Sequence, residues 1–115
     1  MVHKKVVVPI YNRTIYMFKG KYREAMEYFN LKYKSDLPMS EDLESNGCVI
    51  SFIDGSCILI IQKESPPTIA HEICHVVQGI LNNLLKDTDR NTAQETEAYL
   101  TGWVTEQYYK KSGWK

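Results

Sequence analysis

His71-Glu72-Ile73-Cys74-His75 is the stretch that decides the fold, because it places two histidines four residues apart. Residues i and i+4 lie on one face of a helix, so His71 and His75 can present two imidazole nitrogens to one metal ion. Zn²⁺ accepts such nitrogens at about 2.0–2.1 Å. Glu72 lies about 100° round the helix from His71, where its carboxylate can take a proton from a water on the metal. The pentapeptide therefore predicts a zinc site on a helix.

The flanking residues predict where this helix begins and what it packs against. Ser65 is a candidate N-cap, and Pro66 suits the first helical position. Apolar residues then recur at helical spacing and predict one buried face: Ile69, Ile73, Val76, Val77, Ile80 and Leu84. The histidines, Gln78 and Asn82 fall on the opposite face. We expect the first face to pack on a sheet and the second to face a cleft.

The length and charge of the chain limit its class. We expect the 115 residues to form one domain, residues 1–115, with one hydrophobic core. The 14 basic and 14 acidic residues cancel, so the composition predicts neither a nucleic acid nor a membrane as partner. The apolar run at residues 6–8 is too short for a signal peptide or a membrane span. These features predict a cytoplasmic protein.

Three cysteines, Cys48, Cys57 and Cys74, form no even disulfide framework, which also predicts a reducing compartment. Cys74 lies inside the metal motif but about 60° from His71 and about 100° from His75 on the helix. We interpret Cys74 as a packing residue, and the alternative is that it binds the metal.

The remaining pattern predicts an α+β fold, with about four strands and a helix in the N-terminal part. Residues 5–11 and 14–18 are predicted strands joined at Asn12-Arg13. Residues 21–33 carry apolar side chains at helical spacing and predict an amphipathic helix. Residues 34–47 are predicted to form a loop, with room for one helical turn after Ser40.

A hairpin is predicted after this loop, because two β-rich runs flank Asp54-Gly55. With Asp54-Gly55 as a two-residue turn, Phe52 is expected opposite Cys57, and Cys48 opposite Ile61. The two cysteines then do not face each other. The unbroken run at residues 58–61 predicts a strand that is covered on both faces. After a polar connection at residues 86–91, a final helix is expected from about Thr92 to Tyr109.

A catalytic zinc site usually has three protein ligands, so a third is needed beyond the two histidines. Glu97 shares its face of the final helix with apolar residues and is therefore predicted to be a buried carboxylate. A buried carboxylate needs a partner, either a metal or a Lys or Arg from elsewhere. Glu95 points about 160° away and fits a capping box that begins at Thr92. We predict Glu97 as the third ligand, chosen from Asp87, Asp89, Glu95, Glu97 and Glu106.

With these residues the chain resembles the zincin metallopeptidases of the gluzincin type, which pair H-E-x-x-H with a glutamate on a following helix. Here the distance from His75 to Glu97 is 97 − 75 = 22 positions. The run at residues 97–100, Glu-Ala-Tyr-Leu, followed by Gly102-Trp103, is also similar to short zincin-like proteins of phages and prophages. The resemblance covers residues 65–109 and implies a minimal zincin core.

Together the motif and the resemblance predict a zinc-dependent peptidase. Zn²⁺ is expected on His71, His75 and Glu97, with Glu72 as general base. A peptide or protein substrate is expected to add as a strand at a sheet edge, and the sequence is also compatible with an oligomer or a partner protein. Two alternatives stay open: a non-enzymatic, zinc-stabilised interaction or assembly module from a phage, and a zinc hydrolase that cleaves a non-peptide amide. Glu72 argues against the module, since a structural site needs no base.

Overall fold

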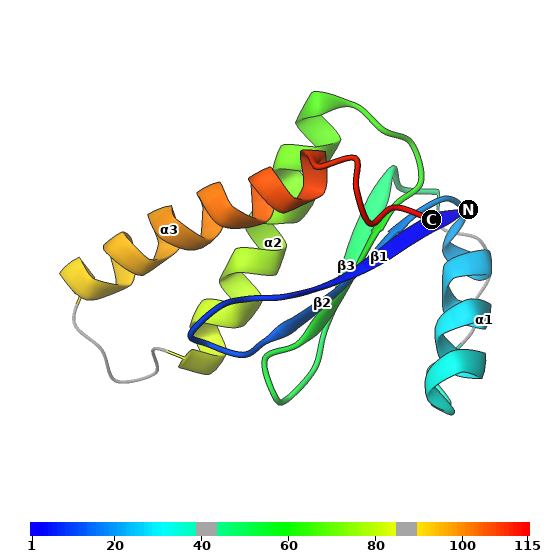
Figure 1. Ribbon diagram of the computed structural model, residues 1–115, viewed down its shortest axis with the longest axis horizontal. Helices are drawn as coiled ribbons and strands as arrows, with labels where there is room; N and C mark the ends of the chain where they lie inside the picture. Colours follow the sequence, from blue (N-terminus) through cyan, green and yellow to red (C-terminus); the bar gives the residue numbers. More distant parts are fainter. Residues whose placement is uncertain (39–43, 85–89) are drawn as a thin grey trace.

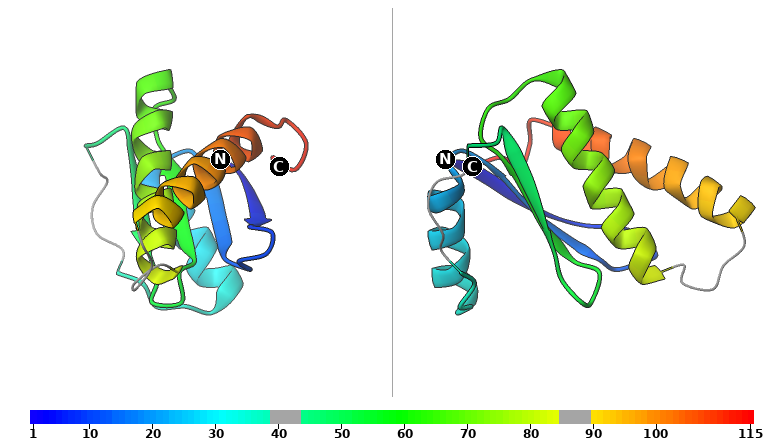
Figure 2. Two further views of the ribbon diagram at one scale, coloured as in Figure 1. Left: turned by 90° about the vertical axis from the view of Figure 1, so that its left-hand side faces the viewer. Right: turned by 180° about the vertical axis from the view of Figure 1, so that it is seen from behind.

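A computed structural model describes residues 1–38, 44–84 and 90–115, with only the backbone described at residues 90–92. It shows the expected α+β class: β1 (Val2–Val7), β2 (Thr14–Lys19), α1 (Tyr22–Tyr33), β3 (Gly47–Ser51), β4 (Cys57–Ile61), α2 (Pro66–Leu84) and α3 (Arg90–Tyr109). The strands form one sheet in the order β1-β2-β4-β3, in which only β2 and β4 are parallel. α1 covers one face of this sheet, α2 covers the other, and α3 crosses α2 on its outer side (Figures 1 and 2).

Each face of the sheet carries its own hydrophobic core. β4 is buried along its whole length, because it lies between two strands and under helices on both faces, as its unbroken apolar run predicted. Phe18, Ile58 and Ile60 pack against α1. Ile15, Met17, Leu59 and Ile61 share the other core with α2 and α3. The sheet is therefore the middle layer of three.

The first strand lies earlier in the chain than the sequence predicted. β1 ends at Val7, whereas residues 5–11 were expected to be extended. Pro9 has no N–H to donate and follows directly after the end of pairing. The chain then turns, with the N–H of Val8 donating to the carbonyl of Arg13 at 2.8 Å. The turn lies at residues 9–11, earlier than the predicted Asn12-Arg13, and Asn12 ends it with a left-handed φ of 54°.

The β3–β4 hairpin forms with a different register from the one predicted. Ser51 pairs with Cys57, and Cys48 pairs with Ile60, one position away from the expected partners. The loop has three residues rather than two, because the N–H of Gly55 donates to the carbonyl of Phe52 at 3.0 Å and Gly55 adopts a φ of 89°. This is a turn followed by a left-handed glycine, the usual three-residue hairpin. The two cysteines do not face each other, as predicted, and all three are free.

The helices lie close to their predicted bounds. α1 and α2 match the expected ranges, and the predicted buried residues Ile69, Ile73 and Ile80 of α2 are buried. α3 begins at Arg90, so Thr92 lies inside its first turn and cannot be the N-cap predicted for it. The helical turn expected after Ser40 and the candidate ligands Asp87 and Asp89 lie outside the described residues. None of the described helices is both long and apolar enough to cross a membrane.

Candidate metal centre

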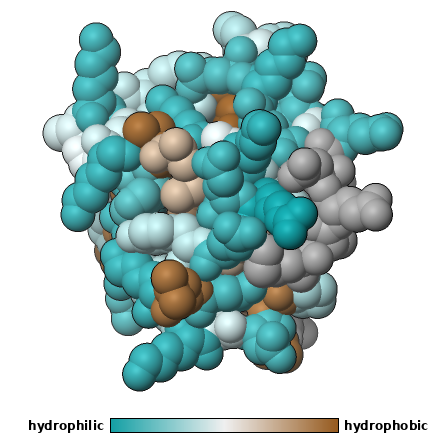
Figure 3. Space-filling view, turned by 90° about the vertical axis from the view of Figure 1, so that its right-hand side faces the viewer, coloured by the Kyte–Doolittle hydropathy of each residue, from teal (hydrophilic) through white to brown (hydrophobic). Residues whose placement is uncertain are grey.

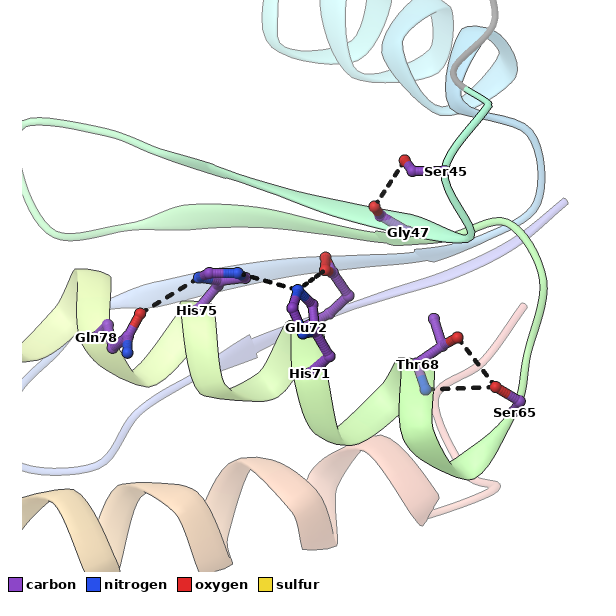
Figure 4. Close-up of polar contacts among 8 residues, drawn as sticks. All are labelled: Ser45, Gly47, Ser65, Thr68, His71, Glu72, His75 and Gln78. Atoms are coloured by element: carbon purple, nitrogen blue, oxygen red, sulfur yellow. Dashed lines mark hydrogen bonds and ion pairs between the residues drawn. The ribbon is translucent and has the colours of Figure 1, made fainter.

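The start and rotation of α2 set the direction of the two histidines. Ser65 is the N-cap, since its Oγ accepts a hydrogen bond from the N–H of Thr68 at 3.3 Å. The apolar face of α2 packs on the sheet, and this contact fixes the rotation of the helix about its axis. His71 and His75 then point to the side of α2 on which β3 lies, away from α3 (Figure 4). Both imidazoles are exposed.

The two histidines lie at a spacing that suits a shared metal. Their Nε2 atoms are 3.2 Å apart (Figure 4). Two Zn–N bonds of about 2.05 Å at a tetrahedral angle place the nitrogens about 3.3 Å apart. Among the side chains that the structure describes, His71, Glu72 and His75 form a group whose ligand atoms all lie within 4.8 Å of one another. The donor set is therefore consistent with a zinc ion.

Gln78 orients the ring of His75. Its Oε1 lies 3.3 Å from Nδ1 of His75. An amide oxygen can only accept a hydrogen bond, so this contact favours the tautomer of His75 with its proton on Nδ1. Nε2 then carries the lone pair that a metal requires, and the outward contact holds the ring in place, as is usual for histidine ligands.

Glu72 is a buried carboxylate with incomplete partners. The residue is only 5% exposed, and its Oε2 has no hydrogen-bond partner among the described residues. Its Oε1 lies 3.7 Å from Nε2 of His71. An isolated buried carboxylate is strongly unfavourable, so Oε2 needs a water or a cation as a partner. Because Glu72 lies next to the histidine nitrogens, a metal ion at the candidate site can be that partner.

Two glycines bring β3 close to α2 at this point. A Cβ at Gly47 would lie 3.0 Å from Cγ of Glu72 and 2.9 Å from the carbonyl oxygen of Ile60. A Cβ at Gly79 would lie 2.6 Å from Oγ of Ser51. Gly47 has no room for a side chain because backbone blocks it, and a side chain at Gly79 would displace the Ser51 hydroxyl. Both glycines thus allow the helix and the edge strand to approach. The isolated glycine in the helical pattern was the signal in the sequence for this approach.

Two hollows extend on either side of Glu72, between α2 and the edge strand β3. One has a volume of about 460 Å³ and is lined by His75, Gln78, Asn82 and residues of β3. The other has a volume of about 320 Å³ and is lined by His71, Thr68 and Ser45 among others. Gly47 and Glu72 line both hollows, so we describe the two hollows together as the β3 groove.

Cys48 also lines the β3 groove, and burial together with the nearby Glu72 raises the pKa of its thiol to about 11. Its thiol is therefore neutral at pH 7.

The structure does not bring Glu97 to the histidines. Its side chain is exposed on α3, as are those of Glu95 and Glu106, so the premise that Glu97 is buried is wrong. Leu100, Thr101, Val104 and Tyr108 lie on the same face of α3 as Glu97. Of these, Leu100, Val104 and Tyr108 are buried, whereas Thr101 is exposed. The N-terminal half of α3 projects beyond α2 (Figure 1), which explains the exposure. The ligand role of Glu97 stays a prediction.

Cys74 is exposed rather than packed in the core, which corrects its interpretation as a packing residue. It lies outside the group formed by His71, Glu72 and His75. The sequence therefore identified the cluster on α2, but not Gly47, Cys48 and Ser51, which complete its surroundings from β3.

Comparisons with known proteins give no relative for this chain: no family model, no curated protein and no solved structure matches it. The resemblance to zincins is thus a prediction that rests on the motif residues alone.

Proposed function

We propose that this protein is a zinc-dependent peptidase whose centre is built on His71, Glu72 and His75. One observation carries the proposal: two histidine nitrogens at 3.2 Å lie next to a buried carboxylate oxygen that has no described partner. A purely structural zinc site would need neither the carboxylate nor the β3 groove. Both features suit a site where water is activated beside a bound substrate.

The chemistry divides between the metal and Glu72. When bound, zinc supplies a Lewis acid that polarises the scissile carbonyl and makes water more acidic. Glu72 accepts the proton of the attacking water and then donates it to the nitrogen of the leaving amine. Burial keeps this carboxylate away from bulk water, and close packing against Gly47 limits the positions that its side chain can take. His71 and His75 hold the metal, with the ring of His75 oriented by Gln78.

The β3 groove suggests the substrate class. β3 is an edge strand whose outer backbone groups can pair with an extended peptide. The hollows lie on both sides of Glu72 and are lined by no Lys or Arg among the described residues. A free C-terminal carboxylate therefore finds no Lys or Arg side chain there to pair with. We propose that the protein cleaves internal peptide bonds of extended segments.

Zinc content is the first test. Protein purified without chelator is expected to contain about one zinc per chain, and His71→Ala and His75→Ala are each expected to lose most of it. His3→Ala is the matched control, because this third histidine lies on β1 at the opposite edge of the sheet. Parent protein that neither contains nor takes up zinc would contradict the proposal.

Glu72→Gln tests catalysis separately from metal binding. The amide keeps the shape of the side chain and removes the base, so zinc content should stay near one per chain. Hydrolysis of an unfolded protein substrate, followed by mass spectrometry, is expected to fall by about 10²–10⁴-fold. Equal turnover by the variant at full zinc occupancy would exclude the general-base role. A zinc-loaded parent that cleaves no peptide bond would favour the non-enzymatic module.

The third ligand is tested by a matched pair on α3. If Glu97 binds zinc, Glu97→Ala should lower zinc affinity strongly, by far more than Glu95→Ala. Both side chains are exposed and carry the same charge, so the pair controls for electrostatic effects. Equal zinc affinity of the two variants would remove Glu97 from the ligand set.

A further inference from the structure

A second pocket lies at the opposite edge of the sheet from the candidate metal centre. It has a volume of about 570 Å³ and runs along the edge strand β1, between α1 and the segment after α3. Three sheet spacings of about 4.8 Å separate the two edge strands, about 14 Å in all. None of the residues that line this pocket belongs to α2 or β3. This site, the β1 pocket, is therefore separate from the metal centre.

The β1 pocket concentrates positive charge in a protein without net charge. Five lysines and one histidine line it, and no acidic residue does: His3, Lys4, Lys5, Lys32, Lys110 and Lys115. Lys110 pairs with Glu106 at 3.5 Å. Within the described ranges, Lys4, Lys5, Lys32 and Lys115 form no ion pair. Burial and the charges of Lys32 and Lys115 lower the pKa of His3, as expected where cations meet without counter-charges.

Lys4 has a structural use that the other lysines lack. It is only 7% exposed, and its Nζ donates to the carbonyls of Gln107 and Lys110 at the end of α3. Its charge thus meets the negative end of the helix dipole. Lys5 and Lys32 have exposed side chains, and no described backbone carbonyl accepts from their Nζ atoms. With no ion pair and no backbone acceptor in the described residues, Lys5 and Lys32 are available to bind an anionic ligand.

Four aromatic rings form part of the remaining walls. Tyr16, Phe18, Tyr28 and Tyr33 line the pocket together with the lysines. Nζ of Lys32 lies 3.2 Å from the hydroxyl of Tyr28, whose ring is 4.4 Å from that of His3. Nζ of Lys5 lies 5.9 Å from the centre of the Tyr16 ring. Charge and flat apolar surface therefore occur side by side.

The backbone of β1 adds a donor. The carbonyl of His3 points outward, because it accepts a hydrogen bond from the N–H of Lys115 at 3.0 Å. In an antiparallel pair the outward residues alternate, so the N–H of Lys5 also points away from β2. The surface on the side of α1 is mainly hydrophilic, with a few isolated hydrophobic side chains (Figure 3). This surface suits a charged ligand better than an apolar partner.

We propose that the β1 pocket binds a small phosphorylated molecule that carries a flat ring, of the size of a nucleoside monophosphate. A phosphate brings about −1.5 to −2 charges at pH 7, which matches several unpaired cations better than one carboxylate does. Lysines bind phosphate as point charges, and aromatic side chains stack on flat rings. The volume lies within the range of about 300–1,000 Å³ that is typical of ligand pockets.

Calorimetric titration in low salt tests the proposal with defined probes: the four nucleoside monophosphates, adenosine, ribose 5-phosphate and inorganic phosphate. At least one nucleoside monophosphate is expected to bind about tenfold more tightly than adenosine and than ribose 5-phosphate, and raised salt should weaken it. The double variant Lys5→Gln/Lys32→Gln should weaken binding by at least about tenfold. The control Lys21→Gln/Lys63→Gln removes equal charge at exposed lysines that do not line the pocket and should bind like the parent.

Three results would overturn the proposal. The first is that no nucleoside monophosphate binds, and the second is that the Lys5/Lys32 variant binds as tightly as the parent. The third is loss of binding in His71→Ala/His75→Ala, which would place the phosphate at the metal centre. Melting curves of all variants confirm that they are folded. Because the β1 pocket lies apart from α2, its result does not depend on whether the protein is a peptidase.

Discussion

Replacing Glu72 by methionine is expected to stabilise the metal-free protein while it removes the proposed catalytic base. Glu72 is 5% exposed, and its Oε2 is buried without a hydrogen-bond partner among the described residues. Methionine has an unbranched side chain of similar length and no polar oxygen, and the two hollows beside Glu72 leave space for it. The change therefore removes an unsatisfied group without opening a cavity.

The size of this effect follows from the burial of the carboxylate. A buried acceptor without a partner costs about 1–3 kcal/mol, and more if it is charged. Unfolding entropy of about 2.1 cal/mol/K per residue gives about 0.24 kcal/mol/K for 115 residues. Each kcal/mol then shifts the melting temperature by about 4 °C, so we expect a rise of about 4–12 °C.

The assay is thermal unfolding in excess chelator, followed by circular dichroism. Glu95→Met is the matched control, because it removes an equal charge from an exposed position, where substitutions usually change stability by less than about 0.5 kcal/mol. A lower or equal melting temperature for Glu72→Met would refute the reasoning. It would mean that the carboxylate is satisfied in the metal-free protein, and its burial would no longer indicate a functional site.

Four further outcomes are expected, two for the cysteines and two for single substitutions. At pH 8 a thiol reagent should modify one cysteine of the native protein, Cys74, and three after unfolding, because burial raises the pKa of Cys48 to about 11 and that of Cys57 to about 12. As the pH rises, the same two thiols lose their protons in the unfolded chain before they do in the folded protein. The free energy of unfolding should therefore fall above a pH of about 9. Urea titrations at pH 7 and pH 10 can measure this fall. Ser65→Ala should lower stability by about 0.5–2 kcal/mol through loss of the α2 cap. Gly55→Ala alone should lower the free energy of unfolding by more than Ser65→Ala does. Gly55 has a φ of 89°, and a Cβ there would lie 2.6 Å from Nε of Arg13.

Local patterns predicted most of the elements and the cluster on α2. The apolar spacing that sets the buried face of α2 also decides where His71 and His75 point. Ser65 and Pro66 determine its first turn through capping and a fixed φ. Each of these effects acts within a few residues of sequence, so a single sequence was enough to predict them. For the same reason, the unbroken apolar run at residues 58–61 was enough to predict that β4 is covered on both faces.

The errors arose where a longer-range contact or an extra residue decides the outcome. The hairpin register depends on whether the loop has two or three residues, and Asp54-Gly55 fits both. The burial of Glu97 depends on how far α2 extends beneath α3. A helical wheel shows which residues share a face, but not how much of that face another helix covers. The β1 pocket combines β1, α1 and the chain after α3, so its excess of lysines could not be seen in an overall charge of zero.

Because Glu97 is exposed on α3, the test of the third ligand also tests whether α3 moves when the metal binds. His71 and His75 face β3, whereas α3 lies on the other side of α2 (Figure 4). A bond from Glu97 to zinc would therefore require α3 to turn or shift relative to α2. Among the side chains of α3 that the structure describes, the buried core residues Leu100, Val104 and Tyr108 all lie in its C-terminal half. The described part of the half that carries Glu97 is therefore less restrained by packing. Tight zinc binding that depends on Glu97 would thus show that metal binding and the docking of α3 are coupled. Zinc binding that does not depend on Glu97 would leave α2 as a site with two histidines, Glu72 and an open face toward the β3 groove.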